Sequence, residues 1–352
     1  MLPNPLPLAA NRTIRRGIVA SAVVIAAALG ATGRVLSQGM PAPPRTMLVA
    51  VSDSVHLEVV DWGGEGPTLI LLTGLGHTAH VFDGFAPRLT SYLHVMGITR
   101  RGVGASSRPK NGYDTTTLVH DIVAVLDSLG LAKASFAGHS FAGSELSVLA
   151  ARFPARVERL IYLDSGFDYR QMLDRIGVAT ARGSPQPPPA TYHLPPWTVA
   201  DWTLYAERSS GAGFPPSEVR QMSQVGPGVG PGVGPGDVIQ GPVTDPEVLR
   251  AMLAGIEPAP LTAIRAPTLA IYAVPTSAEV MYPSWYAFDD SARAQGQRVY
   301  SAVSAEHAAQ RARFHREVAG SRQVIITGAR HYVFLTHPGE VANEILSFML
   351  SK

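Results

Sequence analysis

The sequence predicts an α/β fold with a mostly parallel, doubly wound sheet and one inserted segment. Short apolar runs of strand length alternate with segments whose apolar residues recur at helical spacing, which is typical of a parallel sheet covered by helices on both faces. One strand-to-helix junction reads Gly-His-Ser-Phe-Ala-Gly, and one proline-rich stretch interrupts the alternation. The alternation predicts the fold, while the junction and the stretch locate a candidate site and an insertion.

The first part of the core is predicted to span residues 40–164. Residues 67–73, PTLILLT, form a short apolar run followed by glycine, as fully buried strands do. Residues 115–129 carry apolar side chains at helical spacing and precede Gly130, which is a helix stop. By the same criteria we expect strands at 55–61, 94–99, 134–138 and 157–163 and a helix at 141–152.

The alternation breaks over residues 165–263, which are rich in proline and contain the repeat 225–236. Proline and glycine recur throughout this repeat and exclude a helix or strand, so we expect a flexible surface loop there. An insertion at this point of an α/β core is predicted to be a cap or lid over the carboxyl ends of the strands. The second part of the core, 264–352, resumes with strands at 267–274 and 322–327 and a closing helix at 338–350.

Residues 1–39 are predicted to be a signal peptide or an N-terminal membrane anchor. Arg12, Arg15 and Arg16 precede the uncharged apolar run 17–33, which is the order found in secretory signals. The run is slightly short for a membrane span, but a tether through it stays open as the alternative to cleavage. We expect the protein to be exported, whether periplasmic, secreted or anchored facing outside.

The composition limits the function classes. The 352 residues fit one catalytic domain with an insertion better than two domains, and a net charge of +2 without a long basic cluster argues against nucleic acid as a partner. The chain has no cysteine, which excludes disulfides, thiolate metal sites and cysteine nucleophiles. No feature of the sequence indicates an oligomeric state.

Ser140, in the junction 138–143, is the predicted nucleophile. A sharp strand-to-helix turn forces its middle residue into a strained conformation, and small neighbours keep that side chain accessible. The hydroxyl would lie at a helix N-terminus, where the dipole favours negative charge. Ala142 stands where such junctions usually carry a second glycine.

His331 is the predicted base, because a serine hydroxyl needs a histidine to accept its proton. It follows the last predicted strand across a short turn, at the sheet edge where the junction lies. His337 begins the last helix, and His307 and His315 are expected to be solvated on a polar helix. His139 is expected to point away from the serine within the turn.

Asp164 is the predicted acid of the triad. It ends the strand 157–163, one strand from the nucleophile, and a carboxylate there can hold the tautomer of the imidazole. The alternative acid is Glu279, which follows the strand 267–274, the place where many such enzymes carry theirs.

Backbone N–H groups of Leu75 and Phe141 are the predicted oxyanion hole. Leu75 lies in a glycine-containing turn after the buried strand 67–73, and Phe141 directly follows the nucleophile. Glu145, on the next helix, is expected either on the helix surface or supporting the site from behind.

Residues 46–164 and 267–352 resemble the α/β-hydrolase superfamily, and specifically its lid-bearing serine esterase and peptidase-like members. The stretches that carry the resemblance are TGLGHTAHVFDGFAP from Thr73, GITRRGVGASSRP from Gly97, GHSFAG from Gly138 and GARHYVFLTHP from Gly328. Members usually have His-Gly where this chain has Thr73-Gly74. An acid placed like Asp164 resembles the arrangement in some haloalkane dehalogenases. Those enzymes and the epoxide hydrolases use an aspartate nucleophile, so Ser140 argues against both activities.

The resemblance and the residues together predict a serine hydrolase that cleaves a carboxylic ester or similar acyl bond of a small, hydrophobic substrate, without a cofactor. The lid aromatics Trp197, Trp202 and Tyr205 are candidate pocket residues. Alternatives are an aminopeptidase-like or cofactor-free haloperoxidase-type enzyme, and a non-catalytic ligand receptor of the same fold. A peptidase would need an acidic lid group, for which Glu207 and Glu218 are the candidates. A metal at His77-x-x-His80 is not expected, because no third ligand lies nearby in the sequence.

Overall fold

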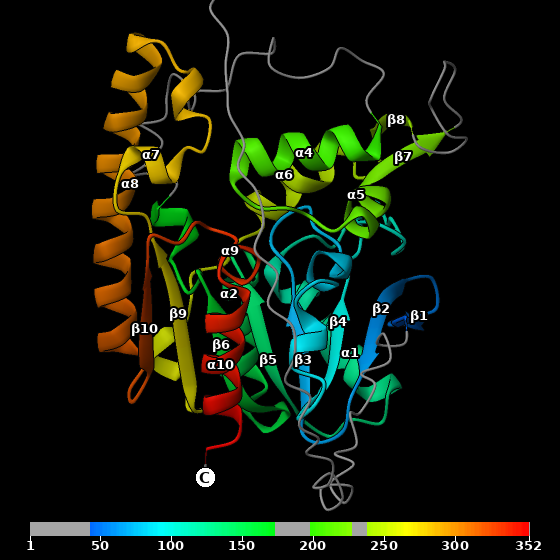
Figure 1. Ribbon diagram of the computed structural model, residues 1–352. Coiled ribbons are helices and arrows are strands. Elements are labelled where there is room, and N and C mark those ends of the chain that lie inside the picture. The colour runs from blue at the N-terminus through cyan, green and yellow to red at the C-terminus, as the bar shows by residue number, and fades with distance from the viewer. Residues whose placement is uncertain (1–42, 173–197, 227–237, 352) are drawn as a thin grey trace, which may run out of the picture. The chain divides into compact units, whose positions relative to one another are not determined.

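The computed structural model describes residues 43–172, 198–226 and 238–351, and its centre is an eight-stranded sheet (Figure 1). The strand order is β1-β2-β4-β3-β5-β6-β9-β10, in which only the pairs β1·β2 and β2·β4 are antiparallel. The predicted mostly parallel α/β sheet is therefore confirmed. The strands are β1 (Arg45–Ala50), β2 (His56–Gly63), β3 (Thr68–Leu72), β4 (His94–Ile98), β5 (Ala134–His139), β6 (Val157–Leu163), β9 (Thr268–Val274) and β10 (Arg322–Thr327).

Helices cover both faces of the sheet. Alternate side chains of one strand point to opposite faces, so Ile70 of β3 joins the core under the helices α1 (Thr115–Ser128) and α2 (Ala142–Arg152). Its neighbour Leu71 joins the opposite core, which is covered by α10 (Pro338–Met349) and the short turn η1 (Ala79–Phe82). Both cores are continuous apolar clusters, as the strand sequences predict.

Strand β1 is an element that the sequence analysis missed. It lies at the edge of the sheet and pairs only with β2, and of its side chains only Val49 is buried. An edge strand with one buried side chain lacks the apolar run by which the central strands are recognised.

The described elements between β6 and β9 are α4 (Val199–Ser210), α5 (Pro216–Met222), β7 (Ser223–Gly226), β8 (Val238–Pro242) and α6 (Pro246–Ala254). In Figure 1, α4, α5 and α6 lie beyond the end of the sheet at which the nucleophile junction stands. Val225 and Gly226 belong to β7, so the prediction of a loop was wrong for the start of the repeat 225–236, and its remainder lies outside the described residues. That the segment acts as a cap stays a prediction.

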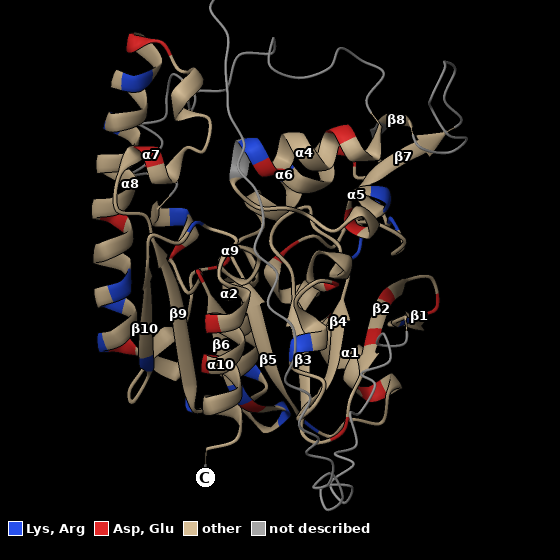
Figure 2. Cartoon of the chain, viewed as in Figure 1, with Lys and Arg blue, Asp and Glu red and all other residues tan. Residues whose placement is uncertain are grey.

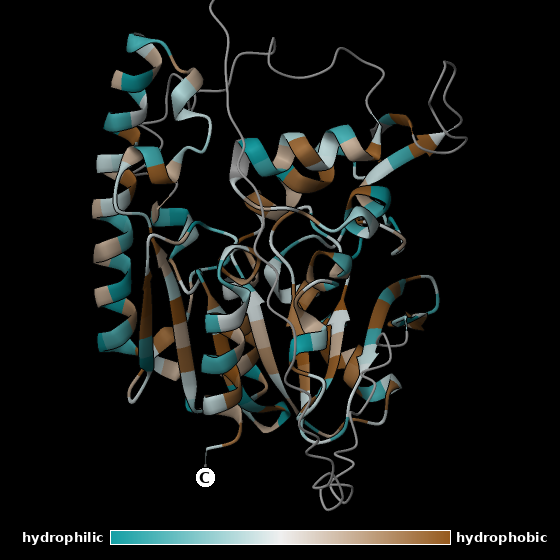
Figure 3. Ribbon diagram, in the orientation of Figure 1, coloured by the Kyte–Doolittle hydropathy of each residue, from teal (hydrophilic) through white to brown (hydrophobic). Residues whose placement is uncertain are grey.

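The helix α8 (Asp290–Glu317) is 28 residues long and flanks the β9–β10 side of the sheet (Figure 1). It is largely hydrophilic along its length, as Figure 3 shows, and Figure 2 shows both signs of charge on it. Its buried side chains include the polar Glu306 and Gln310 beside Val299 and Phe314. The short helices α7 (Ala278–Met281) and α9 (Val333–Thr336) complete the second part of the core.

Within the described ranges, no helix is both long enough and apolar enough to cross a bilayer. The predicted export segment, residues 1–39, and the alternative tether at 17–33 lie outside the described residues.

Candidate active site

The nucleophile junction is a strained turn between β5 and α2. Ser140 has φ of 52°, in the left-handed region that side chains disfavour. Its N–H donates to the carbonyl of Leu163 at 3.2 Å, and Gly143 N–H donates to the Ser140 carbonyl at 2.9 Å. Among the described residues, the only other non-glycine with positive φ is Asp164, at 43°. Both exceptions to normal backbone geometry thus fall on predicted catalytic residues.

Gly138 makes room for the helix to begin immediately after the turn. A Cβ at this position would lie 2.8 Å from Leu146 Cδ1 and 3.0 Å from Ala142 Cβ. The missing side chain therefore accommodates the methyl group of Ala142, which explains why alanine is tolerated where a second glycine is usual.

The structure brings Ser140, His331 and Asp164 together. His331 Nε2 lies 2.9 Å from Ser140 Oγ, and His331 Nδ1 lies 2.7 Å from Asp164 Oδ2. A carboxylate can only accept, so Nδ1 carries the proton and Nε2 presents its lone pair to the serine hydroxyl. Asp164 Oδ1 also accepts from the Ala273 N–H at 3.1 Å, which fixes the carboxylate on the sheet. Glu279, the alternative acid, is exposed in the first turn of α7 and is not among the hydrogen-bond partners of His331.

The spacing of Ser140 and Asp164 is set by the register of the sheet. His139 at the end of β5 and Leu163 at the end of β6 are register partners, and Ser140 and Asp164 are the residues that follow them. Neighbouring strands lie about 4.8 Å apart, so the two side chains start from adjacent points on one edge.

The side chain of His139 contacts the backbone of His331. The ring is buried, and Nε2 donates to the carbonyl of His331 at 3.0 Å. Burial, together with the nearby charge of His331, lowers the pKa of His139 well below its ordinary value. The ring therefore stays neutral and holds the backbone of His331 in place, 4.5 Å from the His331 ring between centroids.

The backbone N–H groups of Leu75 and Phe141 have no acceptor within the described part of the chain. The loop that carries Leu75 passes close to the junction, because a Cβ on Gly74 would lie 3.0 Å from His139 Nδ1 and 3.5 Å from Ser140 Cβ. Two unused donors thus lie on the segments that flank the serine.

A buried ion pair holds this loop, and the sequence analysis missed its arginine. Arg100, which follows β4, donates to both carboxylate oxygens of Glu145 at 2.6 and 2.5 Å. The same guanidinium donates to the carbonyls of Thr73 and Gly74 and to the Thr73 hydroxyl, at 2.6 to 3.0 Å. Glu145 is therefore buried behind the site rather than on the helix surface, and Thr73 occupies the place where a histidine is usual. The position of Arg100 directly after a buried strand was the available signal.

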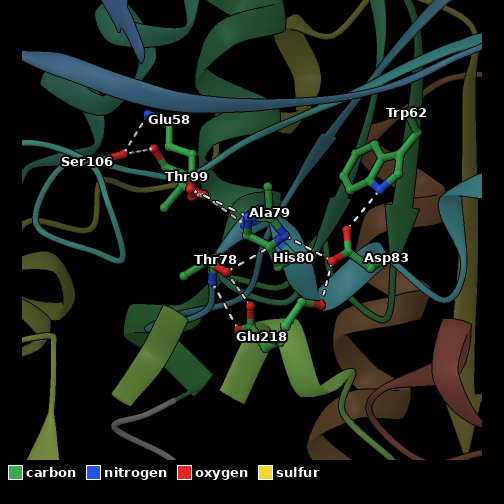
Figure 4. Close-up of polar contacts among 10 residues, drawn as sticks. Glu58, Trp62, Thr78, Ala79, His80, Asp83, Thr99, Ser106 and Glu218 are labelled. Atoms are coloured by element: carbon green, nitrogen blue, oxygen red, sulfur yellow. Dashed lines mark hydrogen bonds and ion pairs between the residues drawn. The ribbon is translucent and has the colours of Figure 1, made fainter. Parts of the chain in front are cut away.

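A second polar network ties α5 to the turn η1, as Figure 4 shows. Glu218 is fully buried and accepts from His77 Nδ1 at 2.9 Å and from the N–H and hydroxyl of Thr78. His80 lies between two carboxylates, with Nδ1 2.9 Å from Asp83 and Nε2 3.5 Å from Glu58.

The charge state of His80 follows from these neighbours. Burial lowers the pKa of His80, but hydrogen bonds and charge from the Asp83 and Glu58 carboxylates outweigh burial and raise it to about 10. Both histidines of the His77-x-x-His80 motif are thus engaged by carboxylates. The described residues contain no group of three or more potential metal ligands.

A cavity of about 480 Å³ opens directly above the serine and the base. Most of its lining is apolar, and the polar side chains come largely from α8 and from the residues beside His331. The described lining residues are Ser140, Asp164, Phe167, Tyr169, Met172, Ala273, Val274, Pro275, Met281, Tyr300, Val303, Ser304, His307, Arg311, Arg330, His331 and Tyr332.

The cavity lining differs from the sequence prediction. Trp202 and Tyr205 are not among the described lining residues; Trp202 packs on Phe214 instead, and Trp197 lies outside the described residues. His307, expected to be solvated, is half-buried and stacks on Phe167 with 4.6 Å between centroids. Because the sequence of α8 is hydrophilic, it did not indicate which of the helix residues face the cavity.

Comparison with known proteins gives a consistent result. A family model described as the alpha/beta hydrolase fold matches residues 67–184. The chain is 31% identical over 196 residues to the proposed carbamate hydrolase RutD of Caulobacter segnis, a match that covers 49% of this chain and 70% of the relative. It is 27% identical over 122 residues to 2-(acetamidomethylene)succinate hydrolase of Mesorhizobium japonicum, covering 34% and 44%. The solved structure of an E-2-(acetamidomethylene)succinate hydrolase shares the fold, with a TM-score of 0.61 at 18% identity over 88% of this chain and 100% of that one.

Proposed function

The chain belongs to the α/β-hydrolase family and is a hydrolase, and from this premise we propose that it is a serine hydrolase acting on a carboxylic ester or similar acyl bond. The observation that carries the proposal is the contact chain from Ser140 Oγ through the His331 imidazole to Asp164, at 2.9 and 2.7 Å. These are the distances at which a base can take the hydroxyl proton and a carboxylate can stabilise the resulting imidazolium.

In the proposed reaction, His331 Nε2 accepts the proton of Ser140 while Oγ attacks the acyl carbon. The carbonyl oxygen becomes negative and is bound by the N–H groups of Leu75 and Phe141, which have no other acceptor among the described residues. Collapse expels the leaving group, which takes the proton from His331 and leaves an acyl-enzyme. Water, activated by the same base, then hydrolyses the ester to Ser140 and releases the acid.

The mostly apolar cavity favours a small substrate with a hydrophobic part. Two relatives have names that specify a carbamate and an acetamido group, so C–N acyl bonds belong in any substrate panel beside esters. The aminopeptidase alternative has no support from the acids named for it: Glu207 is exposed on α4, Glu218 is bonded to His77 and Thr78, and neither is among the described residues of the cavity lining. The non-catalytic receptor alternative does not account for the hydrogen-bonded alignment of Ser140 and His331, because ligand binding alone does not require it.

The decisive experiment is Ser140→Ala in the full chain. We expect the variant to lose both hydrolysis of short-chain p-nitrophenyl esters and labelling by a fluorophosphonate probe, because Oγ forms the covalent bond in both. Ser304→Ala is the matched control: Ser304 lines the same cavity but is not bonded to His331, so labelling should persist. Full labelling of a folded Ser140→Ala protein would refute the proposal.

A further inference from the structure

Two arginines that line the cavity, Arg311 and Arg330, form no ion pair with any described residue. Arg313, two positions further along α8, differs in this respect, since it pairs with Asp168 and with Glu317 at 2.8 Å each. Carboxylates are therefore present near this part of α8, but within the described part of the chain none forms an ion pair with Arg311 or Arg330.

Arg330 is held in position without being neutralised. Its Nε donates to the Val280 carbonyl at 2.6 Å, and this is its one hydrogen bond within the described residues. Gly211, at the end of α4 with φ of 69°, leaves space for the guanidinium, since a Cβ there would lie 2.2 Å from Nη1. The Arg330 side chain is half-buried, and this burial lowers the pKa of Arg330. A partly buried cation without a counter-ion costs free energy, and a bound anion would remove that cost.

Arg311 lines the same cavity from α8. Its Cζ lies 5.8 Å from the centre of the Tyr272 ring, and no carboxylate of the described ranges accepts from it. Burial lowers the pKa of His307 and outweighs the Asp164 and Glu306 carboxylates, which raise it; the charges of His331 and Arg311 lower it further. His307 is therefore neutral beside Arg311, so the positive charge at this wall is that of Arg311 alone.

We propose that the substrate carries a free carboxylate in addition to the acyl bond, and that Arg330 and Arg311 bind this carboxylate. Guanidinium groups bind planar carboxylates through paired N–H donors, and the terminal nitrogens of Arg330 are available for this. Arg330 directly precedes the base His331, so the carboxylate lies near the reacting carbonyl. Apolar lining residues such as Met281 and Val303 suit a short hydrocarbon spacer between the two groups. This inference rests on the proposed serine hydrolase activity.

The test compares two substrates that differ in whether one carboxyl group is free or methylated. Mono-p-nitrophenyl glutarate carries a free carboxylate, and its methyl ester does not. In the parent protein we expect kcat/KM to favour the acid at least tenfold, because charge-assisted hydrogen bonds contribute about that much or more. Arg330→Gln and Arg311→Gln should each reduce this ratio about tenfold, chiefly through loss of the acid.

Arg298→Gln is the matched control. It removes the same charge from α8, but Arg298 is exposed and is not among the residues of the cavity lining, so the ratio should equal that of the parent. Arg330→Lys keeps the charge without the planar fork and should give an intermediate ratio, and fluorophosphonate labelling of each variant shows that the site has formed. A ratio near one in the parent, or an unchanged ratio in both glutamine variants, overturns the inference.

A binding measurement separates this inference from the proposed mechanism. Calorimetric titration of Ser140→Ala protein with monomethyl glutarate needs no turnover, and we expect binding that is lost in the Ser140→Ala/Arg330→Gln double variant. Equal binding of dimethyl glutarate would contradict the arginine site. Residual esterase activity in Ser140→Ala would instead contradict the nucleophile and leave the binding result standing.

Discussion

Replacing Glu145 by glutamine tests whether the buried Arg100–Glu145 ion pair positions the loop that carries Leu75. The Arg100 and Glu145 side chains are only 6% and 2% exposed, and two short hydrogen bonds join them. Glutamine keeps the size of the side chain but removes the charge, so the guanidinium stays buried without a counter-ion. The same guanidinium holds the carbonyls of Thr73 and Gly74, directly before Leu75.

The expected cost follows from this burial. Breaking a buried pair on one side typically costs about 3–5 kcal/mol, a large part of the roughly 5–15 kcal/mol that stabilises a domain. If the freed loop displaces the Leu75 N–H, kcat should also fall, by up to about 10²–10³-fold, which is the effect of losing one oxyanion donor. KM should change less, because the donor acts mainly on the transition state.

Urea unfolding and ester kinetics measure the two effects. Glu158→Gln provides the matched control, since the Lys133–Glu158 pair has a similar distance of 2.8 Å but its side chains are 59% and 32% exposed. Such exposed pairs contribute about 0–1 kcal/mol. If Glu145→Gln is as stable and as active as Glu158→Gln, then the Arg100–Glu145 pair has no role in either folding or catalysis.

Three further predictions concern single side chains. Asp164→Asn should lower kcat by about 10⁴-fold while Glu279→Gln leaves it unchanged, and the reverse order would identify Glu279 as the acid. Tyr169→Phe should lower kcat/KM up to about tenfold, because the buried Tyr169 hydroxyl lines the cavity beside Ser140 and is placed to bond to the substrate. The same kcat/KM in both proteins would show that the hydroxyl does not contact substrate. His80, with its pKa raised from 6.5 to about 10, adds stability that is complete below pH 6.5 and is lost as the pH rises to 10. Unfolding free energy should therefore fall across this window by up to about 1.4 kcal/mol per pH unit, and His80→Gln should flatten the slope.

The sequence was sufficient to predict the parts of the site that sit on the central strands. Ser140, Asp164 and His331 each follow a strand that the apolar pattern identifies, and in a parallel sheet the carboxyl ends of strands meet at one edge. Side chains at those ends must converge, so their contact could be expected before any coordinates.

The walls of the cavity could not be predicted in this way. The helix α8 buries Gln310 and Glu306 beside Val299, so its inward face has no apolar period, and His307 and Arg311 were concealed with it. Arg100 was not singled out, because sequence composition does not distinguish a buried ion pair from a solvated one. Such positions depend on which elements pack together, and local sequence patterns do not record that.

Ser140 and Asp164 follow adjacent strands of the central sheet and so share one rigid support, while Arg311 and His307 line the cavity from α8 at the margin of the sheet. The sheet therefore positions the proposed reacting groups, whereas part of the cavity wall belongs to a separate helix. Substitutions along the inner side of α8 are therefore expected to change the substrate preference while leaving the geometry of Ser140, His331 and Asp164 intact.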